Sequence, residues 1–239
     1  MTYIPSCSNL SERICSEVFA SLDPYFFKKN VFLVMLNFYS KTISLAIIIF
    51  FSLSERVMAQ QVLSAKSQLP LPNHKMEDIT GKKISFNDVA QENGLLVLFA
   101  SNTCPRVLRQ KNSILALSTF LSKKGIGMVA LNSNEAFRER GDNLKEMLKY
   151  ANKVNYEFPY VVDHKHIIAD EFGATHTPQV YLFDKDLRLI YIGNLNGNSK
   201  NTKELSNSNI QPIVENMLSG NLVEIPYIKP KGCTIKRGN

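Results

Sequence analysis

Residues 99–107 read FASNTCPRV, and residues 175–183 read THTPQVYLF. The first stretch ends the apolar run at 94–100 and places Cys104 at the start of a helix. Unbroken apolar runs of this length are typical of strands in a sheet that helices cover on both faces. The second stretch places Pro178 immediately before another apolar strand. Together they predict an α/β domain with a thiol just beyond a buried strand.

Strands and helices alternate outward from these stretches. We predict a hairpin at 79–84, strands at 94–100, 126–131, 158–162, 179–183 and 187–192, and helices at 104–123, 142–153, 166–172 and 210–218. Residues 184–186 leave room only for a tight turn between the last two strands, so these strands are antiparallel. The order predicts an α/β fold with a central mixed sheet flanked by helices.

The front of the chain has a different composition. Residues 42–53 read TISLAIIIFFSL, which suits the apolar part of a signal peptide and is shorter than the roughly 20 residues of a membrane span. Val57-Met58-Ala59 resembles a cleavage site, and Met35 begins a well-formed signal peptide, so residues 1–34 read as an upstream extension. The alternative is an uncleaved membrane anchor, for which residues 31–53 are long enough.

These features divide the chain into three parts. We expect residues 1–59 to be an N-terminal extension with a signal peptide or anchor, residues 60–72 to be a linker, and residues 73–239 to be the folded domain. Either alternative places this domain outside the cytoplasm, periplasmic or extracellular, where thiols oxidise. Cys7 and Cys15 lie in the front part, so Cys104 and Cys233 remain in the domain, enough for one pair.

The composition of the chain limits the classes of binding partner that we expect. The chain is 44% hydrophobic and 21% charged, which is ordinary globular usage and excludes a disordered protein. Its net charge of +7 comes from scattered Lys and Arg residues, so we expect no nucleic-acid partner and membrane contact only through the N-terminal segment. His164 and His166 have no further ligands nearby, so we expect no metal site and no cofactor.

The quoted motifs resemble those of a known family. The N-T-C-P motif at residues 102–105, the F-G-A-T-x-T-P turn at residues 172–178 and the terminal G-C-T-I-K at residues 232–236 are similar to the redoxin group, the thioredoxin-like and peroxiredoxin-like proteins of the AhpC/TSA superfamily. The resemblance covers about residues 70–237. It implies a thioredoxin-like fold and a redox-active cysteine.

The resemblance also implies roles for individual residues. Cys104 is the expected nucleophile, because free backbone N–H groups at a helix start favour the thiolate. Pro105 and Arg106 follow it as expected substrate contacts, with the Arg106 charge close to the thiol. Thr177 and Pro178 resemble the substrate-facing turn, in which the family has a cis-proline. Cys233 either resolves an oxidised Cys104, forms a permanent bridge to it, or stays unpaired.

Several residues depart from the family patterns. Val107 stands where thioredoxins have their second cysteine, and Leu98 where they have a buried carboxylate. Val97 and Ser101 stand where peroxiredoxins have Pro and Thr, so only a hydroxyl of that set survives. The peroxide-polarising arginine has no counterpart.

The expected function is that of a thiol-dependent oxidoreductase or antioxidant protein. It would act on a protein disulfide or a peroxide and receive electrons from a reducing partner thiol. The alternative is a non-catalytic thioredoxin-fold module that binds peptides.

Overall fold

The computed structural model describes residues 63–64, 66–195, 210–221 and 229–238. The chain divides into two units at Ala59 and Gln60, and all described residues belong to the second unit. The predicted signal peptide or anchor, and most of the polar loop after Leu195, lie outside the described residues. Within the described part, no helix is both long and apolar enough to cross a membrane.

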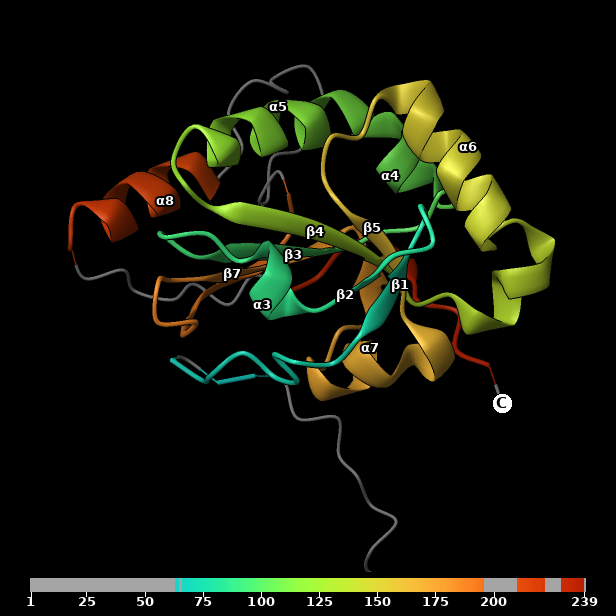
Figure 1. The fold of residues 1–239 in the computed structure, drawn as a ribbon, viewed down its shortest axis with the longest axis horizontal. Helices are drawn as coiled ribbons and strands as arrows, with labels where there is room; N and C mark the ends of the chain where they lie inside the picture. The colour runs from blue at the N-terminus through green and yellow to red at the C-terminus, as the bar shows by residue number, and fades with distance from the viewer. Residues whose placement is uncertain (1–62, 65, 196–209, 222–228, 239) are drawn as a thin grey trace, which may run out of the picture. The chain divides into compact units, whose positions relative to one another are not determined.

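A seven-stranded mixed sheet forms the centre of the described domain (Figure 1). Its strands are β1 (Met76–Asp78), β2 (Lys83–Ile84), β3 (Leu95–Phe99), β4 (Gly127–Asn132), β5 (Tyr160–Val162), β7 (Gln179–Phe183) and β8 (Leu189–Gly193). The spatial order is β2-β1-β5-β4-β3-β7-β8. The central strands β3, β4 and β5 are parallel, and β1, β2, β7 and β8 run antiparallel to their neighbours.

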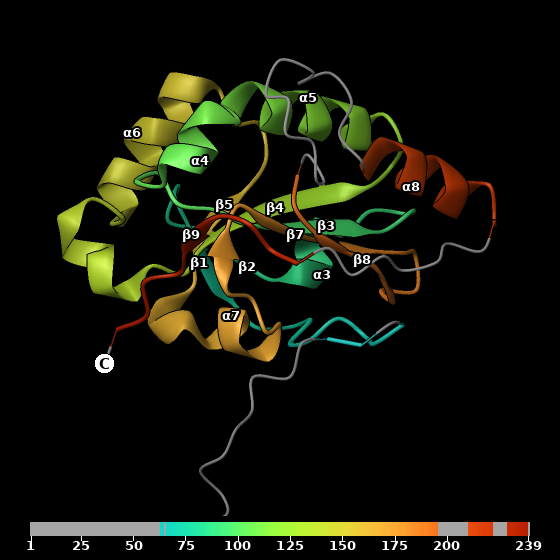
Figure 2. The same cartoon turned by 180° about the vertical axis from the view of Figure 1, so that it is seen from behind.

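Helices cover both faces of this sheet (Figures 1 and 2). One face carries α4 (Pro105–Arg109), α5 (Lys111–Ser122), α6 (Leu144–Val154) and α8 (Ile210–Leu218), and the other carries α3 (Phe86–Val89) and α7 (Ile167–Glu171). Two short 3-10 helices, η1 (Glu135–Arg140) and η2 (His164–His166), follow β4 and β5. The mixed sheet between two helical layers confirms the predicted fold class.

The alternation of side chains along β3 explains the two layers. Leu96 and Leu98 pack into the apolar cluster under α5 and α6, and Leu95, Val97 and Phe99 pack into the cluster beside α7. All five side chains are fully buried. A central strand that is buried on both faces reads as a continuous apolar run, which is why the sequence shows no alternation here.

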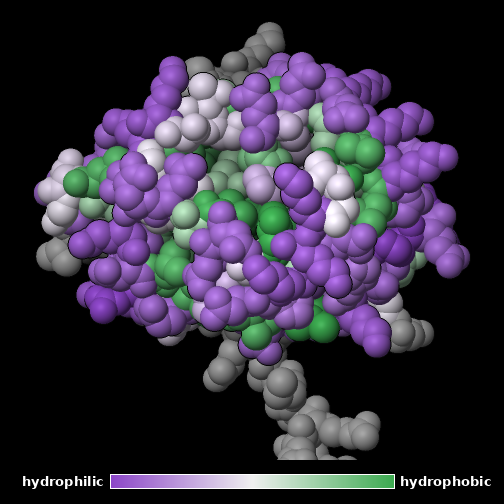
Figure 3. All heavy atoms as spheres, viewed as in Figure 1, coloured by the Kyte–Doolittle hydropathy of each residue, from purple (hydrophilic) through white to green (hydrophobic). Residues whose placement is uncertain are grey.

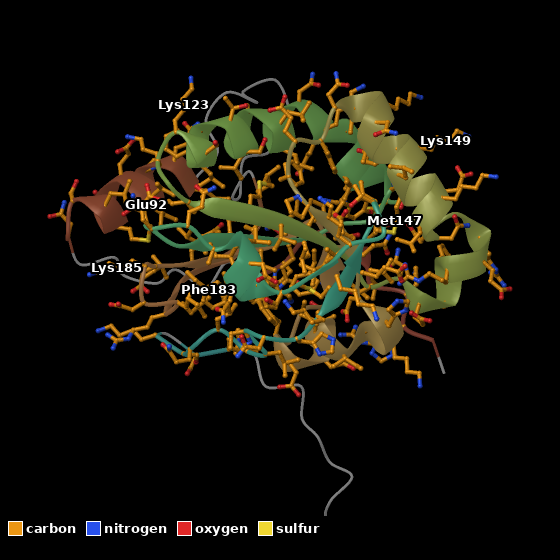
Figure 4. The ribbon with its side chains drawn as sticks, in the orientation of Figure 1. Glu92, Lys123, Met147, Lys149, Phe183 and Lys185 are labelled. Carbon is orange, nitrogen blue, oxygen red and sulfur yellow. A yellow bond between two sulfur atoms is a disulfide. The ribbon has the colours of Figure 1, made fainter. Side chains whose placement is uncertain are left out.

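The outward faces of the helices are polar. In Figure 4, Met147 lies on the sheet side of α6 and Lys149 extends away from it, and the Lys149 side chain is 76% exposed. In the same view, hydrophilic residues cover most of the surface, with hydrophobic residues between them near the middle (Figure 3). This face of the domain therefore meets solvent over most of its area.

Three local predictions need correction. The helix expected at 104–123 is divided into α4 and α5, because the Gln110 N–H bonds to the carbonyl oxygens of both Arg106 and Val107 and its backbone leaves the helical region. The hairpin expected at 79–84 has its first strand earlier, at Met76–Asp78. The N-cap of α6 is Asn143, which accepts a hydrogen bond from the Glu146 N–H, and not Asp142.

Residues 66–69, within the predicted linker, run beside the start of β8. The Lys66 N–H donates to the Leu189 carbonyl oxygen, the Leu69 N–H donates to that of Leu187, and Leu69 is buried. The folded domain therefore begins at or before Lys66, inside the predicted linker.

Candidate functional site

A disulfide joins Cys104 to Cys233 across 129 residues of sequence. Cys104 is the last residue before α4, and Cys233 lies in the two-residue strand β9 (Cys233–Thr234). Their Cα atoms are 6.2 Å apart, within the span of an ordinary disulfide. Of the three alternatives for Cys233, the unpaired one is wrong in this structure.

The disulfide lies against the proline turn. The Thr177–Pro178 peptide bond is cis, as predicted. The Cys104 Sγ is 3.3 Å from the Thr177 carbonyl oxygen, so a reduced Cys104 thiol can donate a hydrogen bond there. Thr177 and Pro178 are both buried. The fold therefore brings together four of the predicted site residues, Cys104, Thr177, Pro178 and Cys233.

The strand that carries Cys233 pairs with the turn itself. β9 forms an antiparallel pair with β6 (His176–Thr177), in which Cys233 is opposite Thr177 (Figure 2 labels β9). The Ile235 N–H extends the pairing with a 2.9 Å hydrogen bond to the Thr175 carbonyl oxygen. From the family resemblance, we expect an extended substrate to pair with the backbone of this turn. In this structure the chain's own C-terminal segment, residues 229–238, occupies that edge.

Two asparagine side chains hold this C-terminal segment on either side of Cys233. Asn194 accepts from the Lys231 N–H at 2.8 Å and donates to the Lys229 carbonyl oxygen at 3.3 Å. Asn134 accepts from the Lys236 N–H at 2.9 Å. These bonds fix the backbone both before and after the cysteine.

Further contacts anchor the end of the segment. Ile235 is 3% exposed and packs into the apolar cluster beside α7. The Arg237 guanidinium bonds to the Asp170 carboxylate at 2.8 Å and to the Ala174 carbonyl oxygen at 2.6 Å. The C-terminal segment is therefore docked by backbone pairing, side-chain clamps and a buried apolar anchor in addition to its disulfide.

A buried carboxylate organises the loop before Cys104. Asp142 is fully buried and accepts hydrogen bonds from the hydroxyl groups of Ser101 and Thr103 and from the side-chain amides of Asn132 and Asn134. These donors come from the loop after β3, from the last residue of β4 and from the residues that follow β4. The same network reaches the C-terminal segment through Asn134. The Asp142 carboxylate therefore helps to position both the loop before Cys104 and the segment that carries Cys233.

Cys104 itself has little contact with solvent. It is 3% exposed and belongs to the apolar cluster under α5 and α6, and apolar burial favours the neutral thiol over the thiolate. The dipole of a helix that begins at Cys104 would favour the thiolate instead. That helix, α4, has only five residues and ends at the Gln110 kink, so this stabilisation of the thiolate is weaker than the long predicted helix would give.

Two charged residues near the turn affect the pKa of His176. Burial lowers the pKa of His176, and the positive charges of Arg106 and Lys229 lower it further. The His176 Nδ1 pairs with the Thr175 hydroxyl at 2.8 Å, so this ring nitrogen bonds to Thr175 and not to the Cys104 sulfur. Pro105 and Arg106 are exposed on the first turn of α4, outside the group formed by Cys104, Thr177, Pro178 and Cys233.

Ser101 does not have the role that its position indicated. Ser101 is 1% exposed, and its hydroxyl group donates a hydrogen bond to Asp142 and accepts one from the Thr103 N–H. In the described residues, the Cys104 sulfur contacts Cys233 and the Thr177 carbonyl group, and no arginine side chain bonds to it. The hydroxyl and arginine that would orient a peroxide are therefore not assembled around this sulfur.

Sequence reasoning did not identify four residues of this site: Asp142, Asn134, Asn194 and Gly232. Gly232 precedes Cys233, and a Cβ atom there would lie 2.8 Å from the Thr177 carbonyl carbon, too close for a side chain. The available signals were the polar run that follows β4 and the glycine next to the cysteine. In the described part of the chain, no three His, Cys, Asp or Glu side chains are grouped to hold a metal ion.

Solved structures share this architecture. A hypothetical protein from Sinorhizobium meliloti is 25% identical, with a TM-score of 0.68 over 74% of this chain and 97% of that chain. An uncharacterized conserved protein from Geobacillus kaustophilus is 27% identical, with a TM-score of 0.65 over 74% of this chain and 94% of that chain. A Chlorobium tepidum protein assigned to thiol:disulfide interchange, DsbE, is 15% identical, with a TM-score of 0.52 over 65% of this chain and 99% of that chain, and shows the thioredoxin-like fold alone.

No protein with a curated description matches significantly. The model of the AhpC/TSA family matches residues 68–192, which is more than half of the chain and includes the central sheet up to the next-to-last residue of β8. This match includes Cys104 and the cis-proline turn, and it ends before the C-terminal segment that carries Cys233. The chain therefore belongs to the AhpC/TSA family of thioredoxin-like redox proteins.

Proposed function

We propose that this protein is a thiol–disulfide oxidoreductase that cycles between the Cys104–Cys233 disulfide and the two free thiols. The observation that carries the proposal is the position of this disulfide, against the cis-proline turn of a redoxin fold with its sulfur 3.3 Å from the Thr177 carbonyl oxygen. A disulfide that only attached the C-terminal segment to the domain would not need to lie beside the Thr177–Pro178 turn.

The cycle transfers two electrons. The reduced protein gives up two thiol hydrogens to a substrate disulfide, RSSR, which becomes two molecules of RSH while Cys104 and Cys233 form their bond. Each half of the exchange is an attack of one thiolate on a disulfide sulfur, with the other sulfur leaving as a thiolate that takes up the proton. A reducing partner thiol returns the protein to the dithiol form by the reverse steps.

A disulfide is favoured over a peroxide as the substrate. Peroxide reduction needs donors that stabilise the leaving oxygen, and the Ser101 hydroxyl is occupied by the buried Asp142 carboxylate. Disulfide exchange needs only an attacking thiolate in line with the S–S bond and a sulfur that leaves as a thiolate. The second cysteine of the pair is already held in place by the docked C-terminal segment. These observations support exchange chemistry, and the predicted signal peptide or anchor is our reason for proposing that it occurs outside the cytoplasm.

The test uses the full chain with Cys7 and Cys15 changed to Ser. The reduced protein is mixed with oxidised glutathione, and the released glutathione and the Cys104–Cys233 link are measured by mass spectrometry. We expect two molecules of glutathione for each link formed, and conversion back to the dithiol by excess glutathione. A link that forms in air but never exchanges with glutathione would show a permanent staple in a non-catalytic module.

A further inference from the structure

We propose that Cys233, and not Cys104, is the sulfur through which partner thiols enter and leave the disulfide. This inference rests on the proposed exchange function and reverses the roles expected from the sequence. It makes Cys104 the internal, resolving sulfur. The argument depends on the direction of attack, on the docking of the C-terminal segment and on the room left at the Thr177 edge.

The direction of attack is set by the chemistry of a disulfide. An incoming thiolate attacks one sulfur along the S–S axis, from the side opposite to the sulfur that leaves. To attack Cys104, it must approach from the side away from Cys233, where Cys104 is 3% exposed and packed within the apolar cluster under α5 and α6. Cys233 also packs against this cluster, but it is only partly buried, so of the two sulfurs we infer that its sulfur has the more open approach.

Docking keeps Cys104 covered. Opening a path to Cys104 requires the C-terminal segment to leave β6, which breaks the Thr177 pairing, the Asn134 and Asn194 bonds and the burial of Ile235. None of these contacts involves the sulfur atoms, so we expect them to persist when the disulfide is reduced. The reduced protein therefore holds two adjacent thiols, of which Cys233 is the outer one.

The occupied edge also limits how a partner binds. Cys233 is paired with Thr177, and the space beside the Thr177 carbonyl group is filled by the Gly232 backbone. A partner cannot add a strand at this edge while the segment is docked. The chemistry that fits is a small thiol, or a cysteine on a projecting loop, that reaches Cys233 from the solvent side.

The steps balance as follows. A partner thiolate RS⁻ attacks the Cys233 Sγ, the S–S bond breaks, and Cys104 leaves as a thiolate that takes up one proton. The product is a mixed disulfide between R and Cys233. A second RS⁻ attacks the R sulfur of this mixed disulfide, which releases RSSR and the Cys233 thiolate. In the opposite direction, Cys233 attacks RSSR and Cys104 then resolves the mixed disulfide.

Two single-cysteine variants separate the roles. In the full chain with Cys7→Ser and Cys15→Ser, Cys104→Ser leaves only Cys233, and Cys233→Ser leaves only Cys104. Each reduced variant is mixed with oxidised glutathione, and the rate of its mixed disulfide is followed by mass spectrometry. We expect the Cys233 thiol to react about tenfold faster or more, because exchange rates follow access and thiolate fraction. Equal rates, or a faster Cys104, would overturn the inference.

A third variant shows why Cys104 is slow. Ile235→Asp, added to the Cys233→Ser chain, places a charge in an apolar cluster and favours release of the C-terminal segment. We expect the rate at Cys104 to rise by at least about tenfold once the sulfur is uncovered. An unchanged rate would contradict the covering role of the segment. If neither sulfur exchanges and glutathione cannot reduce the parent disulfide, the proposed function itself fails.

Discussion

The side-chain oxygen of Asn134 accepts a 2.9 Å hydrogen bond from the Lys236 N–H, across 102 residues of sequence. The amide nitrogen of the same side chain donates to Asp142 at 3.0 Å. Asp142 in turn fixes the loop that leads into Cys104, through Ser101 and Thr103. One polar network therefore connects the loop before the first cysteine to the segment that carries the second, and it positions both sulfurs.

Gly232→Ala tests the fit of the C-terminal segment against the turn. The new methyl group would overlap the Thr177 carbonyl group. The reduced segment can shift to relieve this overlap, whereas the disulfide holds the segment in place, so the disulfide becomes less stable relative to the dithiol than in the parent chain. Overpacking of about 1–3 kcal/mol corresponds to a reduction potential about 20–60 mV higher for a two-electron couple. Equilibration in glutathione buffers measures this potential.

The matched control is Thr234→Ala, which changes the exposed neighbour of Cys233 in the same strand. We expect its potential to stay that of the parent chain. An unaltered potential in the Gly232→Ala chain would mean that the Thr177 edge does not determine the position of Cys233.

Asp142→Asn tests the buried carboxylate. The amide replaces one carboxylate oxygen with an NH2 group, which then faces either the Asn132 or the Asn134 side-chain amide. Both of these amides are donors here, so at least one hydrogen bond is lost in a buried site. We expect the free energy of unfolding to fall by about 1–3 kcal/mol. Urea denaturation of the oxidised full chain measures it.

Asp186→Asn, an exposed carboxylate in the β7–β8 turn, is the control and should change stability by less than about 0.5 kcal/mol. Similar small effects for both variants would show that Asp142 contributes no more than a surface residue.

His176→Asn tests the pH dependence of stability. Burial lowers the His176 pKa, with Arg106 and Lys229 lowering it further, so the unfolded chain takes up the proton first as the pH falls. The contribution of His176 to stability is therefore present above the unfolded pKa of about 6.5 and is lost below it. The asparagine side chain can keep the bond to Thr175 without titrating.

We expect the His176→Asn chain to lose less stability than the parent between about pH 7 and about pH 5, measured by urea denaturation at both. The exposed His74→Asn is the control and should follow the parent. A parent-like loss in the His176→Asn chain would assign the pH dependence to other groups.

The site of processing tests the proposed export. If residues 42–53 are the apolar part of a cleaved signal peptide, the protein recovered from outside the cytoplasm begins near Gln60. Mass spectrometry of its N-terminal peptide measures this. A full-length N-terminus in the membrane fraction would instead indicate an anchor, and a full-length protein in the cytoplasm would contradict export.

The fold was largely predictable because its main strands are buried on both faces. The β3 run and the β7–β8 hairpin are marked by continuous apolar residues and by a gap too short for anything but a turn. The break in the helix at Gln110 was not predictable, because the apolar spacing of Val107, Ile114 and Leu117 continues through it. Such a kink depends on how the backbone carbonyls are shared, which residue types do not show.

The site was predictable only where its residues carry distinctive chemistry. Cys104, Cys233 and the Thr177–Pro178 turn were identified from their residue types. The sequence predicts Asp142 as a helix cap, because Asp142 and Asn143 both suit that position and only the distant partners Ser101, after β3, and Asn132, at the end of β4, decide between them. Clamps such as Asn194 bond backbone groups far away in sequence, and nothing local indicates them.

The most direct test of the redox account is an equilibrium titration of the full chain, with Cys7 and Cys15 changed to Ser, in buffers of defined thiol–disulfide ratio. Acid quenching and alkylation followed by mass spectrometry give the fraction of chains with the Cys104–Cys233 link. We predict a single two-electron transition at about −270 to −120 mV, the range of catalytic couples. Cysteines that never link, or a link that stays oxidised below about −300 mV as structural disulfides do, would contradict the account.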